Sequence, residues 1–160
     1  MNLDGGSLFA PGGRVELGGV AEAGTVGLNV ERNNLSLSFP DQVARTDVSL
    51  TNRSEVDVTA GGSGSIAINA RNLNILGRSR LLAGIGEGLG SVGSQGGDIT
   101  LNARDAITIG NFSSIENLVA SYATGNTGDI NIKAGSLLLT NVAKLSTSIT
   151  GQGDAGNISV

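Results

Sequence analysis

Short runs of alternating apolar and polar residues recur along this chain at similar spacing. The clearest runs open on a glycine and continue with alternating aliphatic residues, in segments 64–70, 97–103, 128–134 and 156–160. The four opening glycines are separated by 33, 31 and 28 residues. A period in this range is typical of repeat architectures, in which each repeat buries its apolar face against its neighbours. The chain is therefore predicted to be a repeat protein.

The alternation has the period of a β-strand, because successive side chains of a strand point to opposite faces. Two further alternating runs follow each opening run, which predicts three short strands per repeat. The spacing of Ile115, Leu118, Val119 and Tyr122 also fits a helix, but the corresponding segments of the neighbouring repeats alternate, which favours a strand. Apart from one inserted residue in the middle repeat, the apolar positions match: Ile66, Ile68, Ala70, Leu73, Ile75, Leu81, Ala83 and Ile85; Ile99, Leu101, Ala103, Ile107, Ile109, Ile115 and Val119; Ile130, Ile132, Ala134, Leu137, Leu139, Leu145 and Ile149.

Strands this short can bury their inward side chains by coiling, so that each coil pairs with the next at the strand spacing of about 4.8 Å. The predicted fold is all-β: a parallel β-helix of about five coils of roughly 28–33 residues each, which gives a rod about 24 Å long. Equivalent side chains are expected to stack into ladders, one of Ile66, Ile99, Ile130 and Ile158 and another of Ile75, Ile109 and Leu139.

The coil boundaries follow from the same alignment. We expect a single β-helix segment over 1–160, with a less regular first coil at 1–34, complete coils at 35–63, 64–96, 97–127 and 128–155, and a further coil beginning at 156–160. The first dozen residues are expected to be irregular, followed by strands at 15–17 and 26–30. The coil at 35–63 is expected to contain strands at 35–39, 48–50 and 56–58. Neither end carries a polar cap, so we expect a segment of a longer protein.

The composition narrows the classes of function. The chain contains 26 Gly but only 2 Pro, and its hydrophobic content of 39% argues against a disordered linker. It has no Cys and no His, which excludes disulfides, thiolate metal sites and histidine-dependent catalysis. The net charge of −4 is spread along the chain and shows no basic footprint for nucleic acid. The first 30 residues lack the continuous apolar core of a signal peptide.

Several segments resemble a known family. They are the Gly-Asp-Ile-x-Ile-x-Ala repeat, its trailing Gly-Gln-Gly-Asp-Ala-Gly-Asn-Ile at 151–158, Pro-Gly-Gly-Arg-Val-Glu-Leu-Gly-Gly at 11–19 and Leu-Ser-Leu-Ser-Phe-Pro at 35–40. Over nearly its whole length the chain resembles the filamentous haemagglutinin-like exoproteins of two-partner secretion, with cyanobacterial-type repeats, downstream of the secretion domain. The resemblance implies a right-handed β-helix, secreted or held on the outer cell surface and exported through an outer-membrane transporter.

Two aspartates are the main candidates for chemistry. Asp98 and Asp129 fall one coil apart, with Arg104 and Asp105 nearby in sequence, and clustered carboxylates with an Arg are typical of Ca²⁺-dependent polysaccharide-cleaving sites. The aligned positions read Ser65, Asp98, Asp129 and Asn157, which instead indicates a corner that prefers small turn-forming residues. We predict no catalytic, cofactor-binding or metal-ligating residue, and Ca²⁺ binding at this pair stays open.

Other motifs favour structural roles. The glycine-rich segments 61–65 and 96–98 are predicted to be corners, because neither a tandem Ca²⁺ repeat nor a phosphate-loop Lys follows them. A threonine array of the ice-binding kind is argued against by Thr100 and Thr108, whose aligned residues are not threonines. Among the aromatic residues, Phe39 is expected to fill a corner or the core. Tyr122, in the loop 120–127, is the best exposed candidate for stacking on a glycan, although the favoured interpretation is an ordinary solvated loop residue.

The resulting hypothesis is a non-enzymatic, structural β-helical stalk segment of a secreted adhesin or haemagglutinin-like protein that supports adhesion or cell contact. Two alternatives stay open: a carbohydrate-active β-helix of the lyase or hydrolase kind, and a truncated fragment without independent function. The partners expected from the resemblance are the secretion transporter and a glycan or protein receptor. Open strand edges also predict end-to-end self-association, and no nucleic-acid partner is expected.

Overall fold

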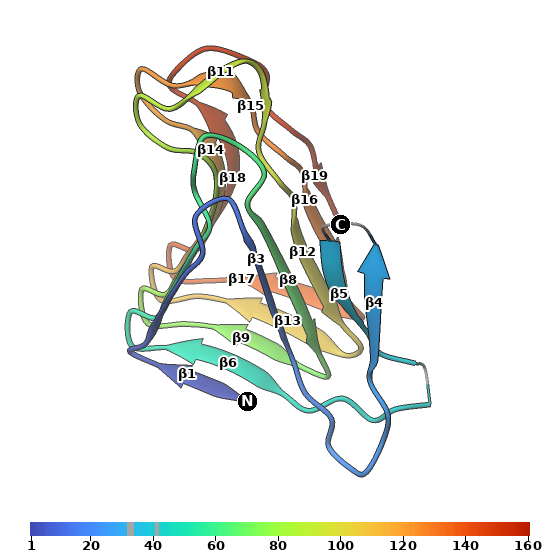
Figure 1. The fold of residues 1–160 in the computed structure, drawn as a ribbon. Coiled ribbons are helices and arrows are strands. Elements are labelled where there is room, and N and C mark those ends of the chain that lie inside the picture. The colour runs from blue at the N-terminus through green and yellow to red at the C-terminus, as the bar shows by residue number, and fades with distance from the viewer. Residues whose placement is uncertain (32–33, 41) are drawn as a thin grey trace.

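The fold is built from strands alone. The computed structural model describes residues 1–31, 34–40 and 42–160, and these residues form nineteen β-strands and no helix (Figure 1). Accordingly, the described residues contain no helix that could cross a membrane. The prediction of an all-β protein is confirmed.

Fifteen of the described strands form three parallel sheets of five strands each. Sheet A contains β1 (Asn2–Asp4), β6 (Val48–Thr51), β9 (Leu73–Ile75), β13 (Ala106–Ile109) and β17 (Ser136–Leu139). Sheet B contains β2 (Ser7–Phe9), β7 (Glu55–Asp57), β10 (Arg80–Ile85), β14 (Ser114–Val119) and β18 (Lys144–Ile149). Sheet C contains β3 (Arg14–Gly18), β8 (Ser65–Ala70), β12 (Ile99–Ala103), β16 (Ile130–Lys133) and β19 (Ile158–Ser159). The chain contributes one strand to sheet A, then one to sheet B and one to sheet C, and it repeats this order five times. Each such set of three strands is one pass.

The strand register confirms the predicted ladders. Ile99 pairs with Ile66 on one side and with Ile130 on the other, and Ile130 pairs with Ile158. Val15 extends this ladder by one further pass. In sheet A the second ladder runs through Ile75, Ile109 and Leu139.

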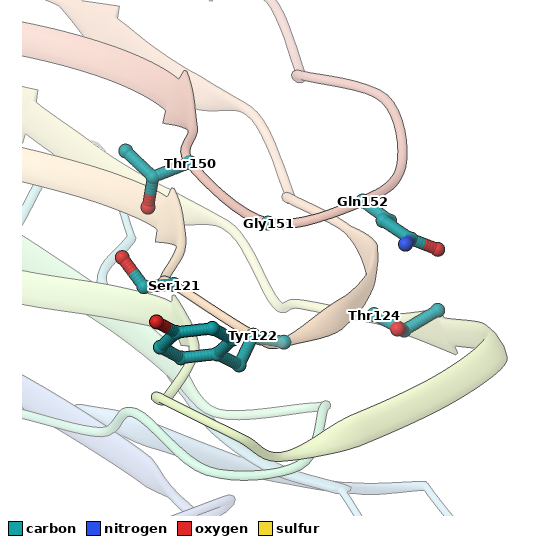
Figure 2. A pocket seen from close by; sticks show the side chains of 7 residues that line it. Ser121, Tyr122, Thr124, Thr150, Gly151 and Gln152 are labelled. Carbon is teal, nitrogen blue, oxygen red and sulfur yellow. The ribbon is translucent and has the colours of Figure 1, made fainter.

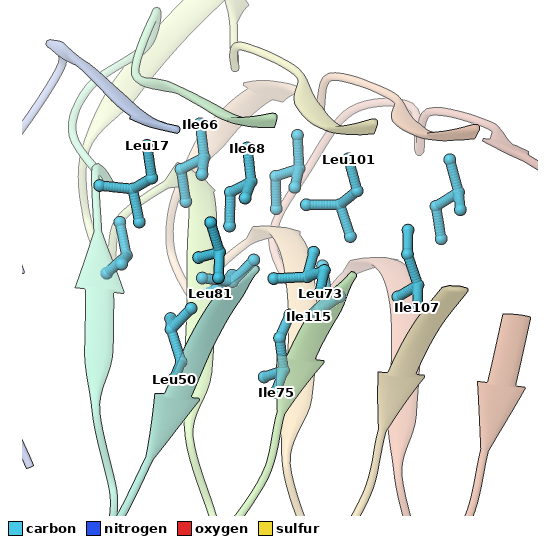
Figure 3. Close-up of a cluster of buried hydrophobic side chains, with 14 of the residues drawn as sticks. Leu17, Leu50, Ile66, Ile68, Leu73, Ile75, Leu81, Leu101, Ile107 and Ile115 are labelled. Carbon is cyan, nitrogen blue, oxygen red and sulfur yellow. The ribbon is translucent and has the colours of Figure 1, made fainter. Parts of the chain in front are cut away.

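Most of the interior is one apolar cluster shared by all three sheets (Figure 3), and Ile85, Val119 and Ala123 form a second, smaller cluster. Leu50 and Ile75 enter it from sheet A, Leu81 from sheet B, and Ile68 and Leu101 from sheet C, and all of these side chains are buried. Fully burying one side chain of this size contributes about 1.5–3 kcal/mol. Because inward positions alternate with outward ones, a one-residue slip of any strand would move its apolar residues to solvent.

The N-terminal part differs from the sequence-based prediction. The first dozen residues contain two regular strands, β1 and β2, and are not irregular. Segments 26–30 and 35–39 are predicted to be strands of two successive coils. In the structure, β4 (Gly27–Glu31) and β5 (Asn34–Ser38) instead pair antiparallel with each other. Segment 19–47 is therefore an insertion between the first and second passes, and of the predicted coil 35–63 only β6 and β7 lie in the parallel sheets.

The hairpin of β4 and β5 is held beside sheet C. The backbone amide of Leu37 donates to Oε2 of Glu16 on β3 over 3.0 Å, and Arg14 forms an ion pair with the same carboxylate at 3.1 Å. The ring of Phe39 lies so close to Gly18 that a Cβ added there would contact it. The guanidinium of Arg45 lies 5.6 Å from the centroid of the same ring. Phe39 therefore fills the junction between the insertion and the sheet, in keeping with its expected role.

The corner between sheets A and B turns through two consecutive residues with left-handed backbone. Asn52, Asn111 and Asn141 have φ of 56°, 54° and 47° and are each followed by another residue with positive φ. Asparagine tolerates this region because its short polar side chain bonds locally. The side-chain amide of Asn141 donates to Oδ1 of Asn111 over 3.0 Å, so the corner also links one pass to the next.

An ion pair fastens the corner between sheets C and A. Nη2 of Arg71 lies 2.8 Å from Oδ2 of Asp47, Nε of Arg71 donates to Oδ1 over 2.8 Å, and the side-chain amide of Asn72 donates to Oδ1 over 3.0 Å. These hydrogen bonds, that of Arg71 first, lower the pKa of Asp47 well below its ordinary value of 3.8. A lowered pKa stabilises the folded state above the unfolded-state pKa and ceases to do so as pH falls through the folded-state pKa.

We therefore expect Asp47→Asn to lower the free energy of unfolding at pH 7, and we expect this difference from the wild type to shrink as pH falls below about 4. Urea unfolding followed by circular dichroism between pH 7 and pH 2 measures both. Arg71→Gln should give the same pH profile, because it removes the other half of the pair. A difference that stays constant over this pH range would contradict the proposed linkage.

Candidate functional site

The corner between sheets B and C contains the glycine–aspartate motif that repeats along the chain. A Cβ added to Gly97 would lie 2.6 Å from the carbonyl oxygen of Gly64 and closer still to that of Ser63. The aligned Gly128 and Gly156 approach the backbone of the preceding pass equally closely. Glycine is therefore required at this position because backbone of successive passes meets here without room for a side chain.

The aspartates of this motif bond between passes. Oδ1 of Asp98 accepts a hydrogen bond from the backbone amide of Asp129 over 2.8 Å, and Oδ1 of Asp129 accepts one from the amide of Asn157 over 2.7 Å. Each carboxylate thus joins its own corner to the same position one pass later. The two aspartates lie at a corner, as the alignment predicts, but each carboxylate bonds to the next pass and not within its own turn.

The structure does not gather the other candidate residues around this pair. Asp98 precedes β12, whereas Arg104 and Asp105 follow it, so the length of a five-residue strand separates them. Nη2 of Arg104 donates to the carbonyl of Pro40 over 3.4 Å, and the amide of Asp105 donates to the carbonyl of Arg71. Over the described ranges 1–31, 34–40 and 42–160, no group of three or more Asp, Glu, His or Cys residues could hold a metal ion.

Substitution of Asp98 distinguishes a backbone acceptor from a cation ligand. Asp98→Ala removes one hydrogen bond between passes and should lower the free energy of unfolding by about 1 kcal/mol. Asp98→Asn retains an oxygen acceptor and should stay within about 0.5 kcal/mol of the wild type. Urea unfolding with and without millimolar Ca²⁺ measures both effects. Stabilisation by Ca²⁺ that Asp98→Asn abolishes would show instead that the carboxylate pair binds the cation.

The loops that lead into this corner differ in length from one pass to the next. Two of them, expected to be loops, contain short strands: β11 (Gly90–Gln95) and β15 (Thr124–Asn126) form a two-stranded parallel sheet beyond sheet B. The last loop joins this sheet by a single parallel bridge between Thr124 and Gln152. The loops before this corner, which differ most in length from pass to pass, are therefore held by backbone pairing between passes.

A difference in loop length exposes Tyr122. The amides of Thr150 and Gln152, two residues apart, donate to the carbonyls of Val119 and Ala123, which are four residues apart. The later pass is thus two residues shorter at this point. In the earlier pass the extra residues form an outward turn, which is closed by the hydrogen bond from the Ala123 amide to the Ala120 carbonyl. Tyr122 lies at the tip of this turn, with φ of 60° and a side chain that is 87% exposed.

The step between the two loops forms a pocket of about 400 Å³. Figure 2 shows the ring of Tyr122 below the backbone at Gly151, with Thr150 and Ser121 towards one end and Gln152 and Thr124 towards the other. Gly151 cannot carry a side chain, because a Cβ there would lie 2.5 Å from the carbonyl of Ala120. The space above the ring is therefore left open by the geometry of the backbone itself. The exposure of Tyr122 agrees with the prediction, whereas the pocket was not predicted.

Another exposed aromatic residue and the threonine candidate of the sequence analysis lie apart from this pocket. Phe112 is 59% exposed at the corner between sheets A and B, with the guanidinium of Arg78 at 5.6 Å from its ring centroid. Thr100 pairs with Ala67 and Asn131, so the register contains no threonine ladder at this position, as the alignment predicted.

Among the described residues, several polar side chains are buried that the sequence analysis did not identify, and Asn117 is the most informative. Asn117 on β14 is fully buried, its amide nitrogen donates to the carbonyl of Gly97 over 2.9 Å, and its Oδ1 has no hydrogen-bond partner among the described residues. Thr147, the paired residue of the next pass, donates its hydroxyl to the carbonyl of Gly156 over 2.8 Å. Gly156 belongs to the same pass as Thr147, whereas Gly97 belongs to the pass before that of Asn117. The period of two between Ile115 and Val119 places Asn117 on the inward face, although the apolar Leu118 beside it interrupts the alternation.

Comparison with known proteins gives no further guidance: no family model, curated protein or solved structure matches this chain. Any function must therefore be argued from the fold and from the geometry of its corners.

Proposed function

We propose that the chain folds as a right-handed parallel β-helix. The support is the order of its strands: each pass contributes one strand to each of three parallel sheets, and one apolar cluster receives side chains from all of them. Parallel strands of consecutive passes, joined through a common core, are what a coiled chain produces.

We further propose that this β-helix is a segment of the structural, non-enzymatic stalk of a surface-exposed, haemagglutinin-like adhesin. The observation that carries the proposal is the stack of five in-register strands in each sheet, which makes a rod of about 24 Å at the usual strand spacing. A rod held by backbone pairing and buried ladders keeps its shape, while the loops at its corners are free to vary. Such a scaffold is suited to holding contact surfaces away from a cell.

Self-association is part of the proposal. The outer edges of β17 and β19 pair with no strand of the described residues, and the ladder residues Leu139 and Ile158 are each 41% exposed there. An edge of this kind presents unpaired backbone groups to any matching strand. Further coils or a second copy of the chain would cover it, and the outer-membrane transporter would be the partner during export.

Surface labelling tests the proposal. Antibodies raised against the chain should label intact cells that produce it, and deletion of its gene should lower attachment of these cells to surfaces or to one another severalfold. An antibody to a cytoplasmic protein is the control for cell integrity. Labelling that requires permeabilised cells would contradict a surface role.

A further inference from the structure

We propose that the pocket at Tyr122 binds a neutral hexose at the end of a glycan. This inference rests on the proposed surface role and gives it a ligand class. Tyr122, whose side chain is 87% exposed, lines the pocket, and an exposed aromatic ring is a surface on which the C–H face of a pyranose packs.

The ring is held out by the backbone. Tyr122 has φ of 60°, in a region that non-glycine residues rarely adopt, and strained backbone of this kind persists only where the surroundings hold it. Those surroundings are the amide of Gly88, which donates to the Ser121 carbonyl over 3.1 Å, and the bond that closes the turn at Ala123. The backbone that carries the ring is therefore held in place by bonds on both sides of Tyr122.

The rim of the pocket supplies hydrogen-bonding groups of the kind that sugar hydroxyls need. Ser121 and Thr124 contribute hydroxyls, and Gln152 contributes an amide with both donors and an acceptor. The hydroxyl of Thr150 donates to the Val119 carbonyl over 3.2 Å, so its oxygen serves as an acceptor. The backbone of Gln152 is fixed on both sides, since its amide donates to Ala123 and its carbonyl accepts from Gly125, each over 2.9 Å. Polar groups fixed around an apolar face are typical of small-molecule sites.

The absence of charge in the lining selects the ligand class. Among the described residues that line the pocket there is no Lys, Arg, Asp or Glu, so an acidic sugar such as a sialic acid would find no cation. Glu87, next to Gly88 in the adjoining loop, would disfavour an anion further. The volume, about 400 Å³, lies near the lower end of the 300–1,000 Å³ that small-molecule sites occupy and suits a terminal sugar residue.

The test is ligand-observed NMR on the intact chain with methyl β-D-galactopyranoside, methyl β-D-glucopyranoside and the methyl glycoside of N-acetylneuraminic acid as probes. We expect saturation transfer to at least one neutral glycoside, strongest at its ring C–H protons, and dissociation constants of roughly millimolar order. Tyr122→Ala should weaken binding about tenfold, whereas Tyr122→Phe should retain it. Gln152→Ala should weaken it by a smaller factor.

Phe112→Ala is the matched control, because Phe112 is also an exposed aromatic residue with positive φ at a corner, and its loss should leave binding unchanged. Circular dichroism verifies that each variant is folded. Stronger binding of the acidic glycoside, no binding of either neutral glycoside, or equal loss in Tyr122→Ala and Phe112→Ala would overturn the inference. These outcomes would leave the stalk proposal standing, since surface labelling tests that proposal separately.

Discussion

Replacing Gly97 by alanine should lower the free energy of unfolding by about 3 kcal/mol. The added Cβ would lie 2.6 Å from the carbonyl oxygen of Gly64 and closer to that of Ser63, which are backbone atoms directly before β8, the strand that pairs with β12. Overpacking against a flexible side chain can be relieved by a change of rotamer, but overpacking against backbone cannot. Urea denaturation at neutral pH measures the loss.

Gly61→Ala is the matched control at the same corner. A Cβ at Gly61 would find its nearest neighbour, the amide nitrogen of Gly90, at 3.6 Å, which is an ordinary contact, and its backbone does not require glycine. This substitution should change stability by less than about 0.5 kcal/mol. Equal effects of Gly97→Ala and Gly61→Ala would show that the close approach between passes does not exist.

Ile99→Ala should lower the free energy of unfolding by about 3 kcal/mol. Ile99 is fully buried in the middle of a ladder, so its truncation leaves a cavity. The neighbours on both sides are too well packed to fill this cavity. Ile158→Ala removes the same atoms from the last position of the same ladder, where the side chain is partly exposed. That change should cost less than about 1 kcal/mol.

The comparison of these two variants isolates the effect of position within the ladder from the effect of residue type. Unfolding curves of both, recorded under one set of conditions, give the difference directly. If Ile158→Ala destabilised the chain as much as Ile99→Ala, the ladder would not run in the order Ile66, Ile99, Ile130 and Ile158, and the stacking of the passes would need to be revised.

The repetitive part of the fold could be predicted because local and long-range requirements coincide there. A strand with period-two alternation also needs its apolar residues in register with those of the next pass. The sequence alignment of the glycine-led runs therefore also aligned the residues that pair between neighbouring passes. Ile66, Ile99 and Ile130 therefore paired as predicted. The role of Asp98 was predicted only in part, since its carboxylate bonds to the amide of Asp129 in the next pass.

The insertion could not be predicted in this way. Residues 26–30 and 35–39 alternate as clearly as any strand of the parallel sheets, and alternation carries no information on whether the partner runs parallel or antiparallel. The hydrogen bond from the Leu37 amide to Glu16 holds this hairpin beside sheet C, and that contact exists only in the folded chain.

The candidate pocket could not be predicted from the sequence, for a related reason. Composition and loop position indicated that Tyr122 is exposed, and this agrees with the structure. The space above its ring, however, arises because the loop at Thr150 is two residues shorter than the loop below it, and that difference becomes a step only once the register of the two passes is known. Gly151 then keeps the space open.

Disulfide trapping tests the stacked, in-register arrangement most directly, because the chain contains no cysteine of its own. Thr100 and Asn131 are paired residues on the outer face of sheet C, and at the strand spacing of about 4.8 Å their Cα atoms lie within reach of a disulfide. Thr100→Cys with Asn131→Cys should oxidise completely to an intramolecular disulfide. Thr100→Cys with Lys133→Cys, displaced by two residues along the same face, should stay reduced. Oxidation of the displaced pair in preference to the paired one would contradict the fold.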